Sequence, residues 1–415
     1  MGKTIYEKIL ARSSGKKEVD PGDILWVTPD LIACSDPEFP GRAKFLEEVG
    51  LQKVPKPEKI VAVIDHFVEQ LAMPAGAENN KYFREWAKKN DITHFYDTGR
   101  GGLQVQVLAE KGHVRPGMMA IGDDTEVEAC GALGAFFKGG ADIWSAMAID
   151  EFWFQVPEIV KCYVTGKFGK GVLGIDLRYK LLGDFGDAFG KYVEFVGPTI
   201  DEMSIDERMN LCSSLYLSGS NGIIGADQKT IDYVKGRTKE PFGVVISDPD
   251  AEYAEIYEYD VSKVEPQVAF PPSPNNVKTI AEAEGIDIDE ACVGSCASGR
   301  LDDLRITAQI LKGRKVHPRV RMFITPSSQE VHLNALREGL INVFIEAGAI
   351  LCLPACGTCP GHIGQLAAGE VCIATSPVNY PGRMGSREAR IYLASPAAVA
   401  ASAMEGKISD PRKYL

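Results

Sequence analysis

The sequence predicts an α/β fold, and two observations carry that prediction. Apolar runs typical of strands alternate with segments of helical periodicity along most of the chain. Polar residues follow several of these runs directly, as happens where parallel strands of an open sheet end. The chain has 415 residues, which is enough for two or three domains with sizeable cores.

The N-terminal stretch supplies the first elements of this fold. A helical pattern over residues 5–10 precedes an apolar run at 23–27 that is typical of a strand. A second run, at 59–64, is apolar on both faces and therefore predicts a buried parallel strand. That strand ends in Asp65 and His66, and catalytic groups in open α/β sheets collect at such ends.

The alternation continues toward the middle of the chain. We expect a helix at 79–90, strands at 92–96 and 118–121, and an Ala-rich helix near 131–140. The second of these strands leads into an acidic cluster at 122–126, again polar groups at a strand end.

The C-terminal half repeats the pattern around one Pro-rich segment, 271–276, which is the clearest linker in the sequence. Before it we expect helices near 177–182 and 205–217 and a strand near 222–225. The elements expected after it are helices at 279–284, 302–311 and 328–338, strands leading into Cys296 and at 320–324, and a final Ala-rich helix from Ser395.

Composition excludes several classes of function. A net charge of −12 and a pI near 5.2 oppose binding to nucleic acid, whose affinity comes largely from Lys and Arg on phosphates. The N-terminus lacks a long apolar segment, so we expect a cytoplasmic protein with no membrane association. Ten cysteines in such a chain are expected to be thiols or metal ligands, not disulfides.

Three of these cysteines stand out because small residues surround them. Cys296 lies within Gly-Ser-Cys-Ala-Ser-Gly-Arg, and Cys356 and Cys359 form a Cys-x-x-Cys motif followed by Pro360 and Gly361. Small residues let the backbone approach a bulky inorganic group and donate N–H bonds to its sulfides. A four-thiolate zinc site normally arrives as two close pairs, so the pattern favours a cluster with one open position. A purely structural role for the three thiols is the alternative.

These motifs resemble the large subunits of the aconitase superfamily, in particular the 3-isopropylmalate dehydratase and homoaconitase group. The resemblance spans most of the chain and includes Asp65-His66 and the stretches 102–112, 153–158, 203–209 and 379–383. It implies a [4Fe-4S] cluster held by Cys296, Cys356 and Cys359, with one iron left to bind substrate.

The resemblance also implies an architecture. We expect a three-domain aconitase-like large subunit without the C-terminal swivel domain, divided into α/β domains at 1–160, 161–272 and 273–415. Family members of this length pair with a small subunit that carries a catalytic serine, so a small swivel-domain partner is expected.

The family's acid pair corresponds to Asp65 and His66, which protonate a departing hydroxyl group in the relatives. A histidine oriented by a neighbouring carboxylate suits a general acid, whereas a structural histidine is the alternative. Asp124, Thr125 and Glu126 stand where the family usually has Asp-Ser-His. The Thr125 hydroxyl can replace that of serine, but we expect Glu126 to be an exposed carboxylate unable to replace histidine, and a solvated acidic loop is the alternative.

The positions expected to bind substrate depart from the family further. Gln106 follows Val105, which replaces a family histidine, and Ser213 replaces an asparagine. Arg383 is the candidate carboxylate clamp, with an ordinary surface arginine as the alternative, while Val378 stands where the family has another arginine. We therefore expect a substrate with altered carboxylate content.

The resemblance implies the function of an iron–sulfur hydro-lyase, which removes or adds water on a small hydroxy acid. The open iron of the cluster serves as the Lewis acid. Two alternatives remain open at this point: a divergent cluster protein with another elimination chemistry, and a non-catalytic iron–sulfur binding or regulatory protein.

Overall fold

The computed structural model describes residues 2–37, 39–68, 74–140 and 143–415. The chain forms two compact units. Unit 1 comprises Met1–Arg100, Gln104–Thr165 and Phe189–Tyr259, and unit 2 comprises Gly101–Leu103, Gly166–Ala188 and Asp260–Leu415. Both units combine helices with parallel strands, so the expected α/β class is confirmed. The three domain ranges expected from the sequence remain a prediction.

Unit 1 is built on a five-stranded parallel sheet among its described residues. The strand order is β4-β3-β2-β5-β6. The strands are β2 (Leu31–Ser35), β3 (Ile60–Val63), β4 (His94–Tyr96), β5 (Met119–Gly122) and β6 (Phe136–Lys138). Ser35 is level with Val63, and Ala33 with Gly122, so β2, β3 and β5 deliver the residues that follow them to one edge of the sheet.

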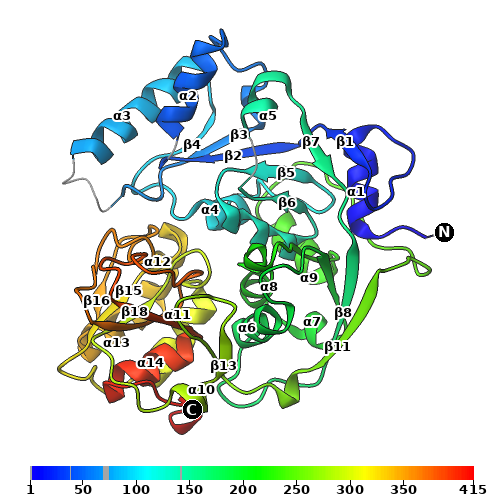
Figure 1. The fold of residues 1–415 in the computed structure, drawn as a ribbon. Coiled ribbons are helices and arrows are strands. Elements are labelled where there is room, and N and C mark those ends of the chain that lie inside the picture. The colour runs from blue at the N-terminus through cyan, green and yellow to red at the C-terminus, as the bar shows by residue number, and fades with distance from the viewer. Residues whose placement is uncertain (1, 38, 69–73, 141–142) are drawn as a thin grey trace. The chain divides into compact units, whose positions relative to one another are not determined.

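Figure 1 shows helices and a separate pair of antiparallel strands around this sheet. The helices are α1 (Ile5–Ser14), α2 (Phe39–Glu48), α3 (Pro74–Lys89), α4 (Gln104–Glu110) and α5 (Ile143–Ile149), with 3-10 turns η1 (Pro57–Lys59) and η2 (Thr125–Leu133). Helices α2 and α3 pack through aromatic rings, since the Phe39 centroid lies 4.2 Å from that of Phe83 and 4.5 Å from that of Trp86. The predicted strand at 23–27 is β1 (Ile24–Val27), which pairs antiparallel with β7 (Phe152–Gln155).

A second sheet of the described chain has the order β10-β9-β8-β11. Its strands are β8 (Ile159–Thr165), β9 (Tyr192–Val196), β10 (Gly222–Ile224) and β11 (Glu255–Asp260), accompanied by α7 (Pro198–Glu202), α8 (Ile205–Cys212), η3 (Leu215–Ser218) and α9 (Gln228–Lys235).

The helix expected at 205–217 ends early, because Ser214 adopts a left-handed backbone with φ of 62°. The prediction of an Ala-rich helix near 131–140 is wrong, since η2 and β6 occupy most of this range. Glycine at 131 lets η2 press on β10, where a Cβ would fall 1.9 Å from the Gly222 carbonyl oxygen.

Unit 2 is built on a seven-stranded sheet, counted over its described residues, with the order β13-β12-β18-β17-β14-β15-β16. The strands are β12 (Gln267–Ala269), β13 (Val277–Thr279), β14 (Glu290–Val293), β15 (Arg321–Ile324), β16 (Ile350–Leu351), β17 (Val371–Ala374) and β18 (Arg390–Ala394). The helices are α6 (Gly174–Phe185), α10 (Ile280–Ala283), α11 (Leu301–Leu311), α12 (Gln329–Arg337), α13 (Leu340–Ala347) and α14 (Pro396–Glu405), with 3-10 turns η4 (Val261–Lys263) and η5 (Pro411–Lys413).

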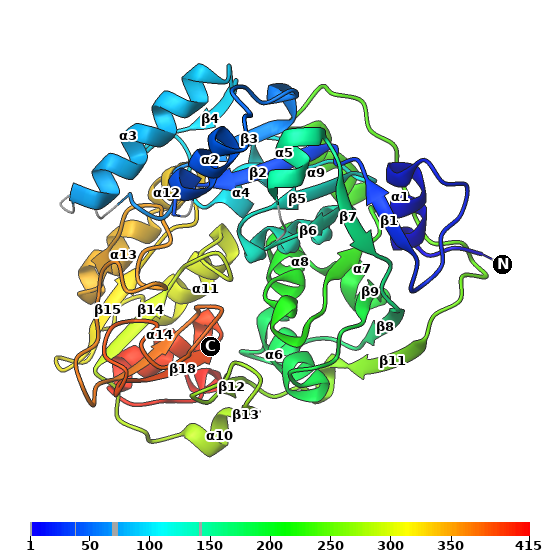
Figure 2. The ribbon, with the colours of Figure 1, turned by 45° about the horizontal axis from the view of Figure 1, so that its top comes forward.

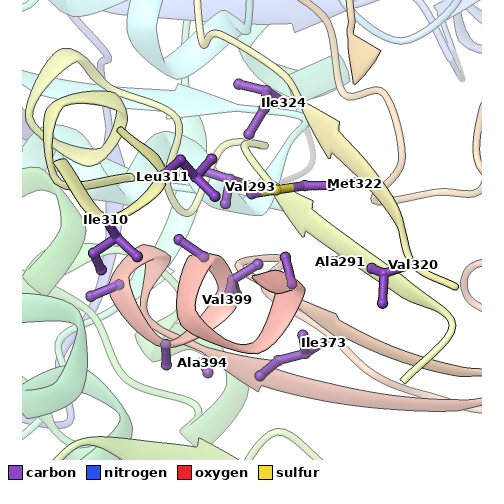
Figure 3. Packing of buried hydrophobic residues seen from close by; sticks show 14 of the residues in the cluster. Ala291, Val293, Ile310, Leu311, Val320, Met322, Ile324, Ile373, Ala394 and Val399 are labelled. Carbon is purple, nitrogen blue, oxygen red and sulfur yellow. The ribbon is translucent and has the colours of Figure 1, made fainter. Parts of the chain in front are cut away.

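The core of unit 2 lies between this sheet and the two helices α11 and α14. Figure 3 shows Val293 and Ile373 of the sheet among the same buried side chains as Leu311 and Val399 of the helices. Burying such aliphatic side chains contributes about 1.5–3 kcal/mol each. This core fixes strands β14 and β17, and through them the loops that follow.

The Pro-rich segment at 271–276 is a turn within unit 2. It joins β12 to β13, which pair antiparallel with Gln267 opposite Thr279, at the edge of the sheet visible in Figure 2. The segment expected as a linker is therefore a turn between two paired strands, because turn residues and linker residues share the same composition. Among the helices that the structure describes, none has the length and apolar character needed to cross a bilayer.

Candidate functional site

His66 is held by carboxylates in unit 1. Its Nδ1 atom lies 2.6 Å from Oδ1 of Asp65 and 3.9 Å from Oδ1 of Asp36, and its Nε2 atom lies 3.8 Å from Oδ2 of Asp124. We call Asp36, Asp65, His66 and Asp124 the histidine cluster. Burial alone would lower the pKa of His66, but Asp65, Asp36 and Asp124 together raise it to about 10. The imidazole is therefore cationic at neutral pH.

The sequence analysis missed Asp36. This buried carboxylate accepts backbone N–H bonds from Asp65 and His66 on Oδ1, at 2.9 and 3.0 Å, and from Phe67 on Oδ2, at 2.7 Å. It thereby fixes the turn that presents the histidine. The signal was available, since Asp36 closely follows the apolar run 31–34, much as Asp65 follows its own strand.

Asp65 is positioned from a third direction as well. Its Oδ2 accepts the backbone N–H of Gln104, the first residue of α4, at 2.8 Å. Burial raises the pKa of Asp65 to about 6 against the opposing charge of His66. Burial likewise raises the pKa of Asp123 to about 7, although the Ser35 N–H and the Gln104 side chain donate to it. The strand ends thus gather several carboxyl groups around one imidazole.

Glu126 does not behave as the sequence predicts. Its side chain is buried, with 2% exposed, and its carboxylate accepts hydrogen bonds from Ser213 Oγ at 2.5 Å and Ser214 Oγ at 3.0 Å. The prediction that Glu126 is an exposed carboxylate and the alternative of a solvated acidic loop are therefore both wrong. Sequence could not show this, because Ser213 and Ser214 stand far along the chain, where α8 ends and the backbone turns left-handed.

The other candidates of unit 1 are also placed by secondary structure. Thr125 begins η2, directly after Asp124, which caps that turn by accepting the Glu126 N–H at 2.9 Å. Gln106 lies on α4 and is buried, and its Oε1 atom has no hydrogen-bond partner within the described part of the chain. An unsatisfied buried amide oxygen is a candidate acceptor for a ligand.

In unit 2, the candidate cysteines lie on two loops that follow β14 and β16. Cys296, Cys356 and Cys359 are buried thiols, and we call them the cysteine set. The pKa of Cys356 is raised well above its ordinary value, first by the hydrogen bond with Cys359, then by burial and by Cys296. A thiol whose pKa is raised by two neighbouring thiols favours a positively charged centre among them.

The surroundings of the cysteine set fit an iron–sulfur cluster. Ser295, with φ of 77°, and Ser298 flank Cys296, and their buried hydroxyls have no hydrogen-bond partner among the described residues. Such donors suit the sulfides of a cluster. A single zinc ion would bring its ligand sulfurs to within roughly 4 Å of one another. The cysteine set is not among the groups of described residues whose ligand atoms all lie within 4.8 Å of one another.

Arg383 also belongs to this site. Its Nη2 atom donates to the Cys359 sulfur at 3.1 Å, and this thiol is the main cause of the raised pKa of the guanidinium. Its Nε atom is buried with no hydrogen-bond partner among the described residues. The alternative of an ordinary surface arginine is therefore wrong. Whether Arg383 also clamps a carboxylate stays a prediction.

Comparison with known proteins agrees with this chemistry. The profile of the aconitase family, described as aconitate hydratase, matches residues 7–285 and 278–406. The chain belongs to the aconitase family. Its aconitase-like fold and large-subunit resemblance are thereby confirmed.

Relatives within the family match along the whole chain. Proteins named 3-isopropylmalate dehydratase large subunit from Heliobacterium modesticaldum and Aquifex aeolicus are 45% and 44% identical to it, and a large subunit 1 from Methanopyrus kandleri is 45% identical. Each comparison covers 100% of this chain and 98% or more of the relative. These names and that of the family denote enzymes that add or remove water, so the expected class of hydro-lyase is confirmed.

A solved structure shares the fold at much lower identity. Holo aconitase X from Thermococcus kodakaraensis aligns with a TM-score of 0.50 and 12% identity, covering 85% of this chain and 84% of that one. This likeness concerns the fold alone.

Proposed function

We propose that this aconitase-family chain is the large subunit of a [4Fe-4S] hydro-lyase that acts on a small hydroxy acid. The observation that carries the proposal is the cysteine set, three buried thiols on two loops. It is flanked by the hydroxyls of Ser295 and Ser298, which have no hydrogen-bond partner in the part of the chain that the structure describes. A cluster held by three cysteines supplies a Lewis acid at its fourth iron.

The residues of the chain divide the remaining work. Cys296, Cys356 and Cys359 would hold the cluster, and Arg383 donates a hydrogen bond that stabilises negative charge on the Cys359 sulfur. His66 would supply the proton for a departing hydroxyl group. Because Asp65 engages Nδ1, the proton to be transferred is the one on Nε2.

Two observations bear on the substrate class, and they point in different directions. The relatives are named for 3-isopropylmalate, which makes this compound the first to assay. Against it stand Val105, Glu126 and Val378 at positions where the family pattern has histidine, histidine and arginine. Loss of a buried charged hydrogen bond costs about 2–5 kcal/mol. We therefore expect poor turnover of isopropylmalate, citrate and homocitrate, and turnover of a related hydroxy acid with altered carboxylate content.

A small partner subunit belongs to this proposal. The relatives are named large subunits, and a large subunit implies a second chain that completes the enzyme. We expect co-purification with a small swivel-domain protein from the native host, and no turnover by this chain alone. Full activity of the isolated chain would contradict this expectation.

The decisive experiment is anaerobic purification with iron and sulfide analysis, followed by assay with the co-purified small subunit. Formation of the unsaturated acid is followed by its ultraviolet absorbance over a panel of hydroxy acids. About four irons and turnover of one panel member support the proposal. A loaded cluster with no turnover of any hydroxy acid would favour the non-catalytic alternative, and efficient turnover of isopropylmalate would show that the departures do not change the substrate.

A further inference from the structure

A second group of metal-ligating side chains lies in unit 2, apart from the cysteine set. Glu290, Cys292 and Cys372 are buried, and their ligand atoms all lie within 4.8 Å of one another. The Cys292 sulfur lies 3.4 Å from Oε1 of Glu290 and 4.0 Å from the Cys372 sulfur. We call these residues the strand triad.

The sheet register explains why the three side chains meet. Glu290 and Cys292 are two residues apart on β14 and so point to the same face of the sheet. Cys372 on β17 is paired with Glu290 and shares that face. Ala291, Val293 and Ile373 point to the opposite face and pack in the core against α11 and α14 (Figure 3). The triad therefore lies outside the apolar core.

The loop that carries two members of the cysteine set covers the triad. The Thr358 side chain, between Cys356 and Cys359, hydrogen-bonds to Cys292 and opposes the increase in the pKa of that thiol. The same loop brings Gly364 so close that a Cβ there would fall 3.2 Å from Oε1 of Glu290.

Charge balance at the triad suits a divalent cation. Arg321 donates to Oε2 of Glu290 from Nε at 3.2 Å and from Nη2 at 3.1 Å. The same guanidinium also donates to Glu370, so it is shared between two carboxylates, and Oε1 of Glu290 is left directed at Cys292. Burial raises the pKa values of Cys292 and Cys372, so without a metal both are neutral thiols. A divalent ion that displaces the two thiol protons to solvent leaves the charge of the site unchanged.

From this geometry we propose that Glu290, Cys292 and Cys372 form a mononuclear site for a soft divalent cation such as Zn²⁺, separate from the cluster ligands. Thiolates and carboxylates are both ligand types that zinc binds. Two sulfurs bound to one zinc ion stand about 3.8 Å apart, close to the separation of 4.0 Å observed here. The Arg321 guanidinium orients the carboxylate, as outer-shell groups of metal sites do. A fourth ligand is a water molecule or the Thr358 hydroxyl.

Zinc binding to the full chain, loaded anaerobically with its cluster, tests this proposal. The protein is incubated with zinc sulfate and desalted, and zinc and iron are then counted by mass spectrometry. We expect about one zinc per chain in addition to the iron, with affinity reduced about 100-fold or more in Cys292→Ser and Cys372→Ser. Cys162→Ser, which replaces another buried thiol on β8, is the matched control and should keep the zinc.

X-ray absorption at the zinc edge of the unmodified protein gives an answer that does not depend on how the variants fold. Two sulfurs at about 2.3 Å and two lighter ligands at about 2.0 Å support the strand triad. Three or four sulfurs would assign the zinc to the cysteine set and overturn the proposal. Absence of bound zinc, or a Cys292–Cys372 disulfide found by mass spectrometry in the anaerobic protein, would also overturn it.

Discussion

The Nδ1 atom of His66 lies 2.6 Å from Oδ1 of Asp65, and the neighbouring residues of one turn thereby form a charged pair. Asp36 holds the same turn by accepting hydrogen bonds from three successive backbone N–H groups, so the imidazole is oriented by a preformed frame. Such a frame suits a proton donor, because a positioned acid needs no reorganisation when the proton moves.

Replacement of His66 by alanine should lower turnover far more than replacement of His94. Loss of a general acid typically costs about 10²- to 10⁴-fold in rate, and we expect a decrease of that size in kcat for His66→Ala. His94 is exposed at the start of β4, so His94→Ala should change kcat less than about twofold. Equal rates for the wild type and His66→Ala would show that another group is the acid.

The pH titration of His66 should be displaced strongly upward. Its pKa is raised to about 10 in the folded chain, above an ordinary value of 6.5. Protonated His66 therefore stabilises the fold fully below about pH 6.5, and this contribution is lost as the pH rises toward about 10. Nuclear magnetic resonance of the imidazole measures the titration directly. Asp65→Asn should move the midpoint down, and a midpoint near 6.5 in the wild type would contradict the geometry.

The cluster should depend on the cysteine set and lose iron in a defined order. We expect about four irons per chain under anaerobic conditions and about three after mild oxidation, because the iron without a protein ligand leaves first. Cys356→Ser should prevent assembly, whereas Cys130→Ser, another buried thiol, should not. Iron analysis with electron paramagnetic resonance distinguishes these states. Zinc in place of iron, released by Cys356→Ser, would refute the cluster.

Loss of the Arg383 donor should loosen the cluster without unfolding the chain. A hydrogen bond to a charged group contributes about 1.5–3 kcal/mol, so Arg383→Gln should lose iron in air roughly 10- to 100-fold faster. The exposed Arg390 on β18 is the control, and Arg390→Gln should behave as the wild type. The absorbance of the cluster over time is the measurement. Unchanged iron retention in Arg383→Gln would show that the bond to Cys359 is dispensable.

We expect replacement of Ser213 to lower the stability of the fold rather than to weaken substrate binding directly. Its hydroxyl donates to the buried Glu126 carboxylate, and Ser213→Ala should lower the free energy of unfolding by about 1.5–3 kcal/mol. The Ser14 hydroxyl donates to carbonyl groups of its own helix, so Ser14→Ala should change the free energy of unfolding by no more than about 0.5 kcal/mol. Urea unfolding measures both. A large increase in KM with unchanged stability would restore Ser213 as a residue that binds substrate directly.

The sequence by itself determined the α/β class, the strand that ends at Asp65 and His66, and the three cysteines that small residues mark out. These features are local, since strand periodicity and the motifs around each thiol involve neighbours along the chain. The sequence did not reveal Asp36 as the support of His66, the burial of Glu126 by Ser213, or the contact of Arg383 with Cys359. Each of these joins residues that are distant in sequence, and their proximity depends on sheet register and on where helices end. The same holds for the strand triad, because only the pairing of β14 with β17 brings Cys372 to Glu290 and Cys292.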